Sequence, residues 1–484
     1  MFEQQNKPFI FFSIAVLLAL PFHLLIQDGM FMDAVHYTCV GRNLADGFGT
    51  FWFPHFSKLD LVIPGVHAFH EQPPLVFGIQ ALFFKLLGQS LYVERIYVAI
   101  TVLLSAYLIK ALWQANFSRG NEPRKLFWLP VLLWITSPIV YWGGSNNVLE
   151  NTLGLFALVS VLISWQLLRK ASGNVLMWML AGAGIFLAVF SKGFPGLFPL
   201  AVPFLYWLCF RKQPFSRMLL YTFYLCLSFS VLLGILLLIP EGRESLSVYF
   251  FKRVLYRITE ATTSEHRWET LQFVLQDAAP MAGALLLVWL IRRFSKVQVN
   301  MREYARQALF FILVGLSASL PLMLTMIQKP FYVLPAYPYF AIGIALLMLP
   351  TVSAWIRKIN EQRSGFKIWR IVSLILLLSA PVFIALQYGK TKREKDVLHD
   401  VHVMSAVVGE GNDLSTGGNT FFEDWVLQCY IMRYYKISMD FRQDHPHKYF
   451  VKEKDKNSEF DFSGYSKVDT PLYKYELYMR NDMP

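Results

Sequence analysis

Single acidic residues stand at the edges of long apolar runs in this sequence, where a charge is costly unless it has a partner or a task. Asp33 opens a polar stretch in which His36, Tyr37 and Arg42 follow at helical spacing. Glu150 lies about one turn inside an apolar run of its own. A carboxylate in such a place can take a proton from a substrate hydroxyl or orient a polar substrate. Asp33 could instead cap the helix that it begins.

The stretch His70-Glu71-Gln72-Pro73-Pro74 stands directly before another apolar segment. Two prolines suit the first turn of a helix, because the first amides of a helix need no partner. Glu71 would then lie at the N-terminus of that helix, where three roles are open. It could be a second carboxylate of a site, a metal ligand together with His70 or His266, or a charge that suits the helix dipole.

Lone cations form a third set of candidates. Lys192, in Ser-Lys-Gly-Phe-Pro-Gly, and Lys329, in Gln-Lys-Pro-Phe-Tyr, have no acidic neighbour in the sequence. Arg257 belongs to a longer loop, 240–272, whose own glutamates could balance its charges. Cations of this kind fit an anionic group such as a lipid phosphate. We expect anion binding by Lys192 and Lys329, while partnering within the loop stays open for Arg257.

The composition of the chain indicates that the helices carrying these residues lie in a membrane. The chain has 484 residues, of which 55% are hydrophobic and 16% charged, whereas a soluble domain carries about 25% charged residues. Only helices satisfy their own backbone in lipid and reach across about 30 Å in some twenty residues. We therefore expect a polytopic α-helical membrane protein with about 11–13 transmembrane helices. The apolar runs behind this expectation are 9–26, 91–112, 126–142, 148–168, 175–190, 195–210, 217–239, 273–291, 304–326, 331–350 and 368–388.

The distribution of basic residues predicts how these spans are oriented. Lys and Arg cluster in every second connection, and basic loops are typically cytoplasmic. This alternation accounts for the net charge of +12 without nucleic acid as a partner. It places the N-terminus in the cytoplasm and the C-terminal tail outside. It also requires that residues 72–88 form a short helix at the outer surface, within a long first loop, and not a further crossing.

The tail predicts a separate fold. "VLHDVHVMSAVV" has helical spacing, while "HKYFVKE" and "LYKYELYMR" alternate as strands do. We expect two domains: a transmembrane domain, 1–389, and a small soluble α/β domain, 390–484, in the periplasm. The four cysteines show neither paired spacing nor a metal pattern.

An ordered set of motifs carries a resemblance to a known family. After the acidic residue and tyrosine of the first loop come "RNLADGFG", "EQPPL", "NNVLENTLGLF", "SKGFPGL" and "QKPFYVLPAYP". The set resembles the bacterial glycosyltransferases of the C-type (GT-C) fold that use a lipid-phosphate sugar, among them the protein O-mannosyltransferases and the aminoarabinose transferase of lipid A. The resemblance covers roughly residues 10–350.

The resemblance implies a periplasmic active site in the bacterial cytoplasmic membrane, with Asp33 as the catalytic carboxylate and Glu150 as the second acidic position. The Asp-Glu pair that is usual in the mannosyltransferase subgroup is absent, since Ala34 follows Asp33. The Glu-Lys-Pro-Pro-Leu of the bacterial relatives reads Glu71-Gln72-Pro73-Pro74-Leu75 here. A lysine that would contact phosphate is therefore missing.

The chemistry that fits these residues is transfer of a sugar from a polyprenyl phosphate to an unknown acceptor. A phosphate leaving group needs no general acid, so the site has to supply a base and cations. Asp33 is the expected base. Lys192, Lys329 and Arg257 form the expected phosphate clamp, with Arg42 in reserve. The resemblance adds Tyr37 and Glu71 to the substrate-binding residues.

Direct displacement by one base would invert the anomeric carbon. No cofactor is obligatory for this chemistry, and Glu71, His70 and His266 could hold an optional divalent metal. The lipid bilayer and the lipid-linked donor are the expected partners.

Two other functions remain open at this point. A lipid or glycan transporter would also explain spans with intramembrane charges, although it predicts repeats between halves, and none stands out. A non-enzymatic receptor would bind through its outer tail.

Overall fold

Long helices dominate the structure. The computed structural model describes residues 2–59, 68–255, 264–295, 300, 302–442, 446–454, 456 and 460–482. Within them, nine helical segments are long and apolar enough to cross a membrane. Seven are single helices: α1 (Phe2–Leu25), α4 (Val93–Gln114), α7 (Leu149–Arg169), α8 (Val175–Lys192), α10 (Phe215–Leu238), α13 (Glu269–Ser295) and α16 (Ser364–Ala385). In the other two, a 3₁₀ segment extends the α-helix: α14 (Ala305–Ser319) with η4 (Leu320–Leu324), and η5 (Pro330–Ala336) with α15 (Tyr337–Arg357).

Two of the predicted spans are interrupted. The run 126–142 divides into α5 (Trp128–Ile135) and α6 (Pro138–Gly143), with Pro138 at the start of the second piece. A proline has no N–H to donate to the preceding turn and disfavours a helical residue before it. The run 195–210 begins as the 3₁₀ segment η2 (Phe194–Ala201), which contains Pro199, and continues as α9 (Val202–Phe210). A proline is thus present at each interruption.

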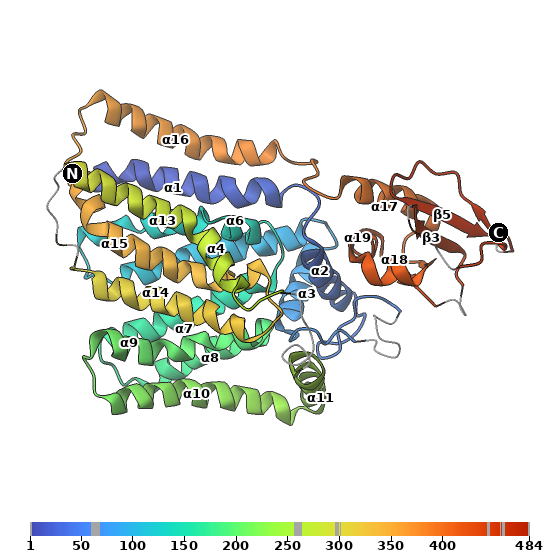
Figure 1. Cartoon of the computed structure of the whole chain (residues 1–484), viewed down its shortest axis with the longest axis horizontal. Coiled ribbons are helices and arrows are strands. Elements are labelled where there is room, and N and C mark those ends of the chain that lie inside the picture. Colours follow the sequence, from blue (N-terminus) through green and yellow to red (C-terminus); the bar gives the residue numbers. More distant parts are fainter. Residues whose placement is uncertain are drawn as a thin grey trace. The chain divides into compact units, whose positions relative to one another are not determined.

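The chain divides into two compact units. Unit 1 comprises Met1–Ile26, Val98–Ser145 and Leu149–Tyr388. In it α7 packs on α8, α8 on α10, and α14 on α15. The first and last of its long helices, α1 and α16, lie side by side (Figure 1). The helices α10 and α16 leave many large apolar side chains exposed, as expected of helices that face lipid.

Unit 2 joins the first loop to the tail: it comprises Gln27–Tyr97, Asn146–Val148 and Gly389–Pro484. The first loop contains α2 (Met32–Ala45), which packs on α3 (Leu75–Leu87). The short helix predicted within 72–88 is confirmed as α3, whose 13 residues are too few to cross a bilayer. Asp28 and Thr391 pair as a parallel bridge between the two ends of this unit.

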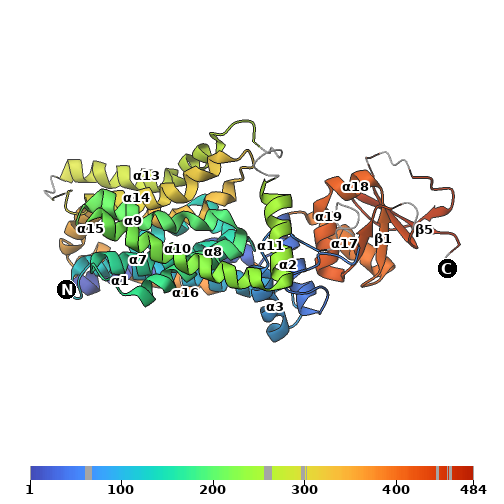
Figure 2. The ribbon, with the colours of Figure 1, turned by 90° about the horizontal axis from the view of Figure 1, so that it is seen from below.

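The tail is a small α/β fold, as predicted. Its elements are α17 (Lys395–Val408), β1 (Asp413–Thr416), α18 (Gly418–Glu423), α19 (Trp425–Tyr435), β2 (Ser438–Asp440), β3 (Tyr449–Glu453), β4 (Tyr465–Lys467) and β5 (Tyr475–Arg480). The sheet order is β2-β1-β3-β5-β4, with β1 parallel to β2 and β3 and the other pairs antiparallel. Figure 2 shows β1 and β5 of this sheet together with the helices α17, α18 and α19 of the tail.

Three further short segments connect the long helices of unit 1. They are η1 (Glu122–Leu126), α11 (Pro240–Val248) and a π-helical turn (Tyr249–Val254). Single π turns occur frequently at functional sites.

Candidate functional site

Glu150 and Lys192 meet in unit 1 as a buried ion pair. Glu150 lies in the first turn of α7, and Lys192 is the last residue of α8. The Lys192 ammonium donates to the Glu150 carboxylate, and only 7% and 2% of the two side chains are exposed. The structure thus brings together two of the predicted site residues that stand 42 positions apart in the sequence.

Aromatic rings complete the surroundings of Lys192. Its Nζ lies 4.6 Å from the ring centroid of Tyr332 and 5.2 Å from that of Phe331. Both rings belong to η5, and Trp142 of α6 stacks on Phe331. A cation over an aromatic face gains electrostatic energy. The sequence had drawn attention to Lys329 in this motif, whereas the structure adds the two aromatic residues that follow Pro330.

The end of α8 has a strict local geometry. Gly193 follows Lys192 with a φ of +99°, a conformation that glycine adopts readily. A Cβ at this position would collide with the hydroxyl of Tyr249, the first residue of the π turn. That hydroxyl also donates to the Lys192 carbonyl at 3.4 Å. Gly193 and Tyr249 therefore fix where α8 ends and where the Lys192 side chain begins.

In unit 2, α2 carries Asp33 in its first turn. The residue that caps α2 is Phe31, and no side chain makes a capping hydrogen bond there. The alternative that Asp33 is a helix cap is therefore wrong. Asp33 is half-buried and acts electrostatically on the thiol of Cys429. Tyr37 is buried four residues further on, with its ring 6.1 Å from that of Phe77.

Arg42 uses its nitrogen atoms within unit 2. Its Nη1 donates to the carbonyls of Met432 and Arg433 at 2.8 Å each, and Nε and Nη2 donate to Asn43 Oδ1. Only 1% of the residue is exposed. These contacts account for the burial of Arg42 without a ligand. Its role as a reserve ligand for phosphate stays a prediction.

His36 is a residue whose surroundings the sequence did not reveal. Its ring centroid lies 4.3 Å from Phe56, 4.9 Å from Phe69 and 5.6 Å from Trp425, to which it is nearly parallel. Burial lowers the pKa of His36 to about 4, although the nearby Glu71 carboxylate opposes the shift. The imidazole is therefore neutral at neutral pH, and its Nε2 has no hydrogen-bond partner among the described residues.

Asn147 organises the first loop, which sequence reasoning missed. Its amide donates to Thr38 Oγ1 of α2 at 2.8 Å and to Gln80 Oε1 of α3 at 3.0 Å, while Gln80 donates back to Asn147 Oδ1. The neighbouring Asn146 accepts from the amide of Phe31. The only signal in the sequence is the pair of asparagines before Glu150.

Of the remaining candidates, Lys329, His266 and His70 are among the described residues. Arg257 lies outside the described residues. Lys329 is exposed. His266 lies 3.6 Å from Glu269, and His70 meets the ring of Phe53 edge-on. Among the described residues, no three His, Cys, Asp or Glu side chains gather in a way that could hold a metal ion.

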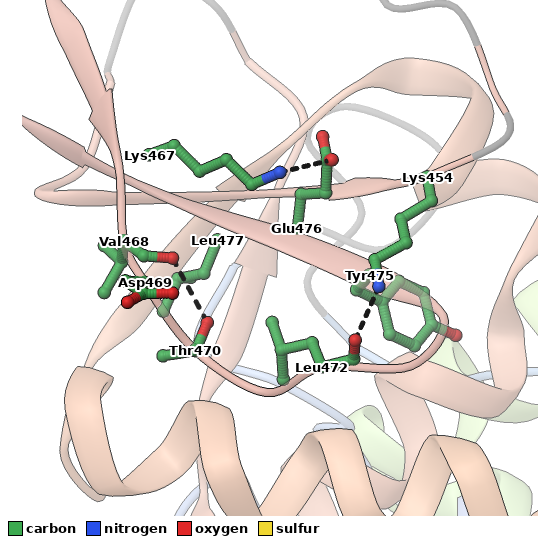
Figure 3. Close-up of a pocket in the computed structure, with 9 residues that line it drawn as sticks. All are labelled: Lys454, Lys467, Val468, Asp469, Thr470, Leu472, Tyr475, Glu476 and Leu477. Carbon is green, nitrogen blue, oxygen red and sulfur yellow. Dashed lines mark hydrogen bonds and ion pairs between the residues drawn. The ribbon is translucent and has the colours of Figure 1, made fainter.

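A pocket of about 280 Å³ lies in the tail, over β4, β5 and the loop between them (Figure 3). Lys467 pairs with Glu476, and Lys454 donates to the Leu472 carbonyl. Both lysines that line the pocket therefore already have a partner within it. None of the predicted site residues lines it.

Comparison with solved structures shows the class of fold. ArnT from Cupriavidus metallidurans bound to undecaprenyl phosphate superposes with a TM-score of 0.62 over 98% of both chains, at 15% identity. The apo oligosaccharyltransferase of Archaeoglobus fulgidus gives 0.54 over 93% of this chain and 70% of that one, at 10% identity. The chain has the fold of the C-type glycosyltransferases and is a multi-pass membrane protein, which confirms the expected fold class.

Sequence comparison points to particular relatives. The chain is 26% identical over 355 residues to undecaprenyl phosphate-α-4-amino-4-deoxy-L-arabinose arabinosyl transferase 2 of Proteus mirabilis, covering 70% of this chain and 57% of the relative. It is 23% identical over 347 residues to the corresponding transferase of Erwinia tasmaniensis, covering 69% and 58%. The chain therefore spans less than two thirds of the length of these curated relatives. No family model matches it.

Proposed function

We propose that this protein is a glycosyltransferase that transfers a sugar from a polyprenyl phosphate to an acceptor at the periplasmic face of the bacterial inner membrane. The named relatives and the C-type fold support the reaction class. The structural observation that carries the proposal is the buried pair of Glu150 and Lys192 beside the ring of Tyr332. It brings a carboxylate, a cation and an aromatic face together, and a cation of this kind can bind a phosphate while the carboxylate accepts from hydroxyl groups.

In the proposed reaction the Asp33 carboxylate takes the proton of the acceptor hydroxyl. The acceptor oxygen bonds to the anomeric carbon as the bond from that carbon to the phosphate oxygen breaks. The electron pair leaves with the polyprenyl phosphate, and the configuration at the anomeric carbon inverts. Because a phosphate leaves as a weak base, the site stabilises its charge and does not protonate it.

The phosphate is the proposed ligand of Lys192, Lys329 and Arg257, with Arg42 in reserve. Glu150 holds the Lys192 ammonium in place and orients the sugar or the acceptor. Tyr37 and Glu71 line the site in this proposal. No metal is required in this proposal, since the single phosphodiester of the donor carries less charge than the diphosphate of a nucleotide sugar. A divalent ion at Glu71, His70 and His266 is an optional addition. The proposal that no metal is required is tested by measuring turnover in excess chelator, which should leave the rate unchanged.

The proposed topology places the N-terminus in the cytoplasm, and residues 1–389 and 390–484 are the proposed transmembrane and periplasmic domains. The sugar and the acceptor are not specified by the residues described. The donor that the relatives' names give, undecaprenyl phosphate-α-4-amino-4-deoxy-L-arabinose, is the first to test.

The deciding experiment incubates the purified full chain in bilayer discs with candidate polyprenyl-phosphate sugars and measures the polyprenyl phosphate released. We expect release with at least one donor, and a loss of about 100-fold for Asp33→Asn, because a positioned base contributes at least that much. Asp461→Asn is the control, since Asp461 is exposed and its hydrogen bonds go to Ser463 in its own loop. Near-normal turnover of Asp33→Asn would exclude Asp33 as the base. Movement of labelled lipid without release would favour a transporter.

A further inference from the structure

Helix α19 of the tail packs along α2, the helix that carries Asp33. The contacts follow one another in register. The ring of His36 lies nearly parallel to that of Trp425, and Cys39 Sγ lies 3.5 Å from the Cys429 carbonyl. Further along, Arg42 donates to the carbonyl of Met432.

These positions recur every three residues on α2 and every three or four on α19, which places them on one face of each helix. Asp33 occupies the next position of the same row on α2, one turn before His36. The electrostatic effect of Asp33 on Cys429 agrees with this placement.

Buried charges fasten α19 to α2 and to α4. Arg42 donates to two of the last carbonyls of α19, those of Met432 and Arg433, and Met432 accepts from the Lys436 amide as well. Arg433 of α19 donates to Glu94, in the first turn of α4, at 2.8 Å, with 4% and 6% of the side chains exposed. This pair therefore ties α19 to the start of α4. Loss of one partner from such a pair leaves a buried charge without compensation. The contact is therefore costly to disturb.

Helix α2 depends on such support. It has 14 residues, and its N-cap residue, Phe31, has a side chain that cannot accept a capping hydrogen bond. Isolated helices of this length are marginal in water. Just before α2, the Tyr430 hydroxyl of α19 donates to the Met30 carbonyl at 2.6 Å. The start of α2, where Asp33 stands, is thus attached to the tail.

We propose that Trp425 and Tyr430 of α19 are positioning residues that hold α2, and with it Asp33, in the catalytic geometry, and that Arg433 holds α19 itself in place. This inference rests on the proposed function, because it is the role of Asp33 as the base that gives the position of α2 its importance. The tail is then a structural part of the catalytic unit and not an appendage that only reads the acceptor.

The first measurement is steady-state release of polyprenyl phosphate by the full chain and its variants. For Trp425→Ala we expect kcat to fall at least 10-fold with the KM for the lipid donor changed less than about 2-fold, since a displacement of 1 Å can cost about 100-fold in rate. Trp425→Phe should recover most of the loss, because a ring can still stack on His36. Tyr473→Ala removes an exposed aromatic side chain from the same domain and is the matched control.

The second measurement does not depend on turnover. Cys39 is fully buried at the contact, and burial raises the pKa of its thiol to about 12. With Cys39 as the sole cysteine, labelling by a maleimide should be slow in the parent chain and at least 10-fold faster in Trp425→Ala, but unchanged in Tyr473→Ala.

Wild-type kcat together with continued protection of Cys39 in both Trp425→Ala and Arg433→Met would overturn the inference. Exposure of Cys39 without any loss of kcat would overturn it too. A parent chain that releases no polyprenyl phosphate from any donor would contradict the proposed function, while the labelling result would still report on the support of α2.

Discussion

At the scale of single residues, the buried ion pair of Glu150 and Lys192 affects the stability of the folded protein. Two buried charges lose much of their hydration. Their mutual attraction offsets this loss only while both charges are present. We predict that Lys192→Met lowers the free energy of unfolding by about 3–5 kcal/mol, whereas the double variant Glu150→Gln with Lys192→Met recovers most of that loss. The midpoint of thermal unfolding in detergent measures both effects.

The exposed pair of Lys125 and Glu3 supplies the control for this cycle. Lys125→Met should change stability by less than about 1 kcal/mol, as is typical of surface pairs. Equal losses in Lys192→Met and in the double variant would contradict a direct coupling of the two buried charges.

His36 predicts a pH dependence. The pKa of a histidine is about 6.5 in an unfolded chain, and burial lowers it to about 4 in the folded protein. Between these values the unfolded state binds a proton that the folded state does not, so stability falls as the pH falls from about 6.5 towards 4. The loss reaches about 3 kcal/mol, at 1.36 kcal/mol per pH unit. Thermal unfolding midpoints at pH 8 and pH 5 should therefore differ less in His36→Phe than in the parent chain.

Individual candidates could be found from the sequence, but their partners could not. Glu150 and Lys192 were visible as charges beside apolar runs, yet nothing local indicated that they pair. Arg42 was interpreted as a reserve ligand for phosphate. Its contacts are carbonyls 390 and 391 positions away, which no pattern around Arg42 could reveal.

At the scale of elements, the packing of α2 on α3 depends on a glycine. A Cβ at Gly41 would stand 2.9 Å from Gln80 Cβ, which is closer than packed atoms lie. We predict that Gly41→Ala destabilises the protein by about 1–3 kcal/mol, the usual range for overpacking, and also lowers turnover. Unfolding midpoints in detergent measure the first effect.

Gly234→Ala in α10 is the matched control, because nothing lies within 4 Å of a Cβ there. It should be neutral or stabilise by up to about 1 kcal/mol through helix propensity. Equal stability of Gly41→Ala and Gly234→Ala would contradict the close packing of α2 on α3.

Hydropathy and alternation were sufficient for most elements. Among the described residues, nine long helical segments, the short α3 and the strands β3 and β5 follow patterns of burial that repeat along the chain. The failures have local causes. The run 126–142 contains Pro138, whose effect on the backbone a hydropathy pattern does not register.

At the scale of the whole molecule, nothing in the sequence indicated that the first loop and the tail pack together. In the structure both belong to unit 2. The ion pair between Arg433 and Glu94 and the bridge between Asp28 and Thr391 join segments more than 300 positions apart. Contacts at such separation follow from the folded chain and leave no periodic signal. The proposed catalytic helix α2 could therefore be found from its own residues, but its support could not.

The orientation of the whole chain in the membrane can be tested by labelling two single-cysteine variants. The alternation of basic loops predicts that the tail is periplasmic and that the connection between α9 and α10 is cytoplasmic. In a chain without native cysteines, Tyr473→Cys should react with a membrane-impermeant maleimide in intact cells whose outer membrane is permeabilised. Lys212→Cys should react only after lysis. Both positions are exposed, so access to the reagent depends on the membrane alone. Labelling of Lys212→Cys in intact cells, with Tyr473→Cys protected, would reverse the topology and remove Asp33 from the periplasmic face.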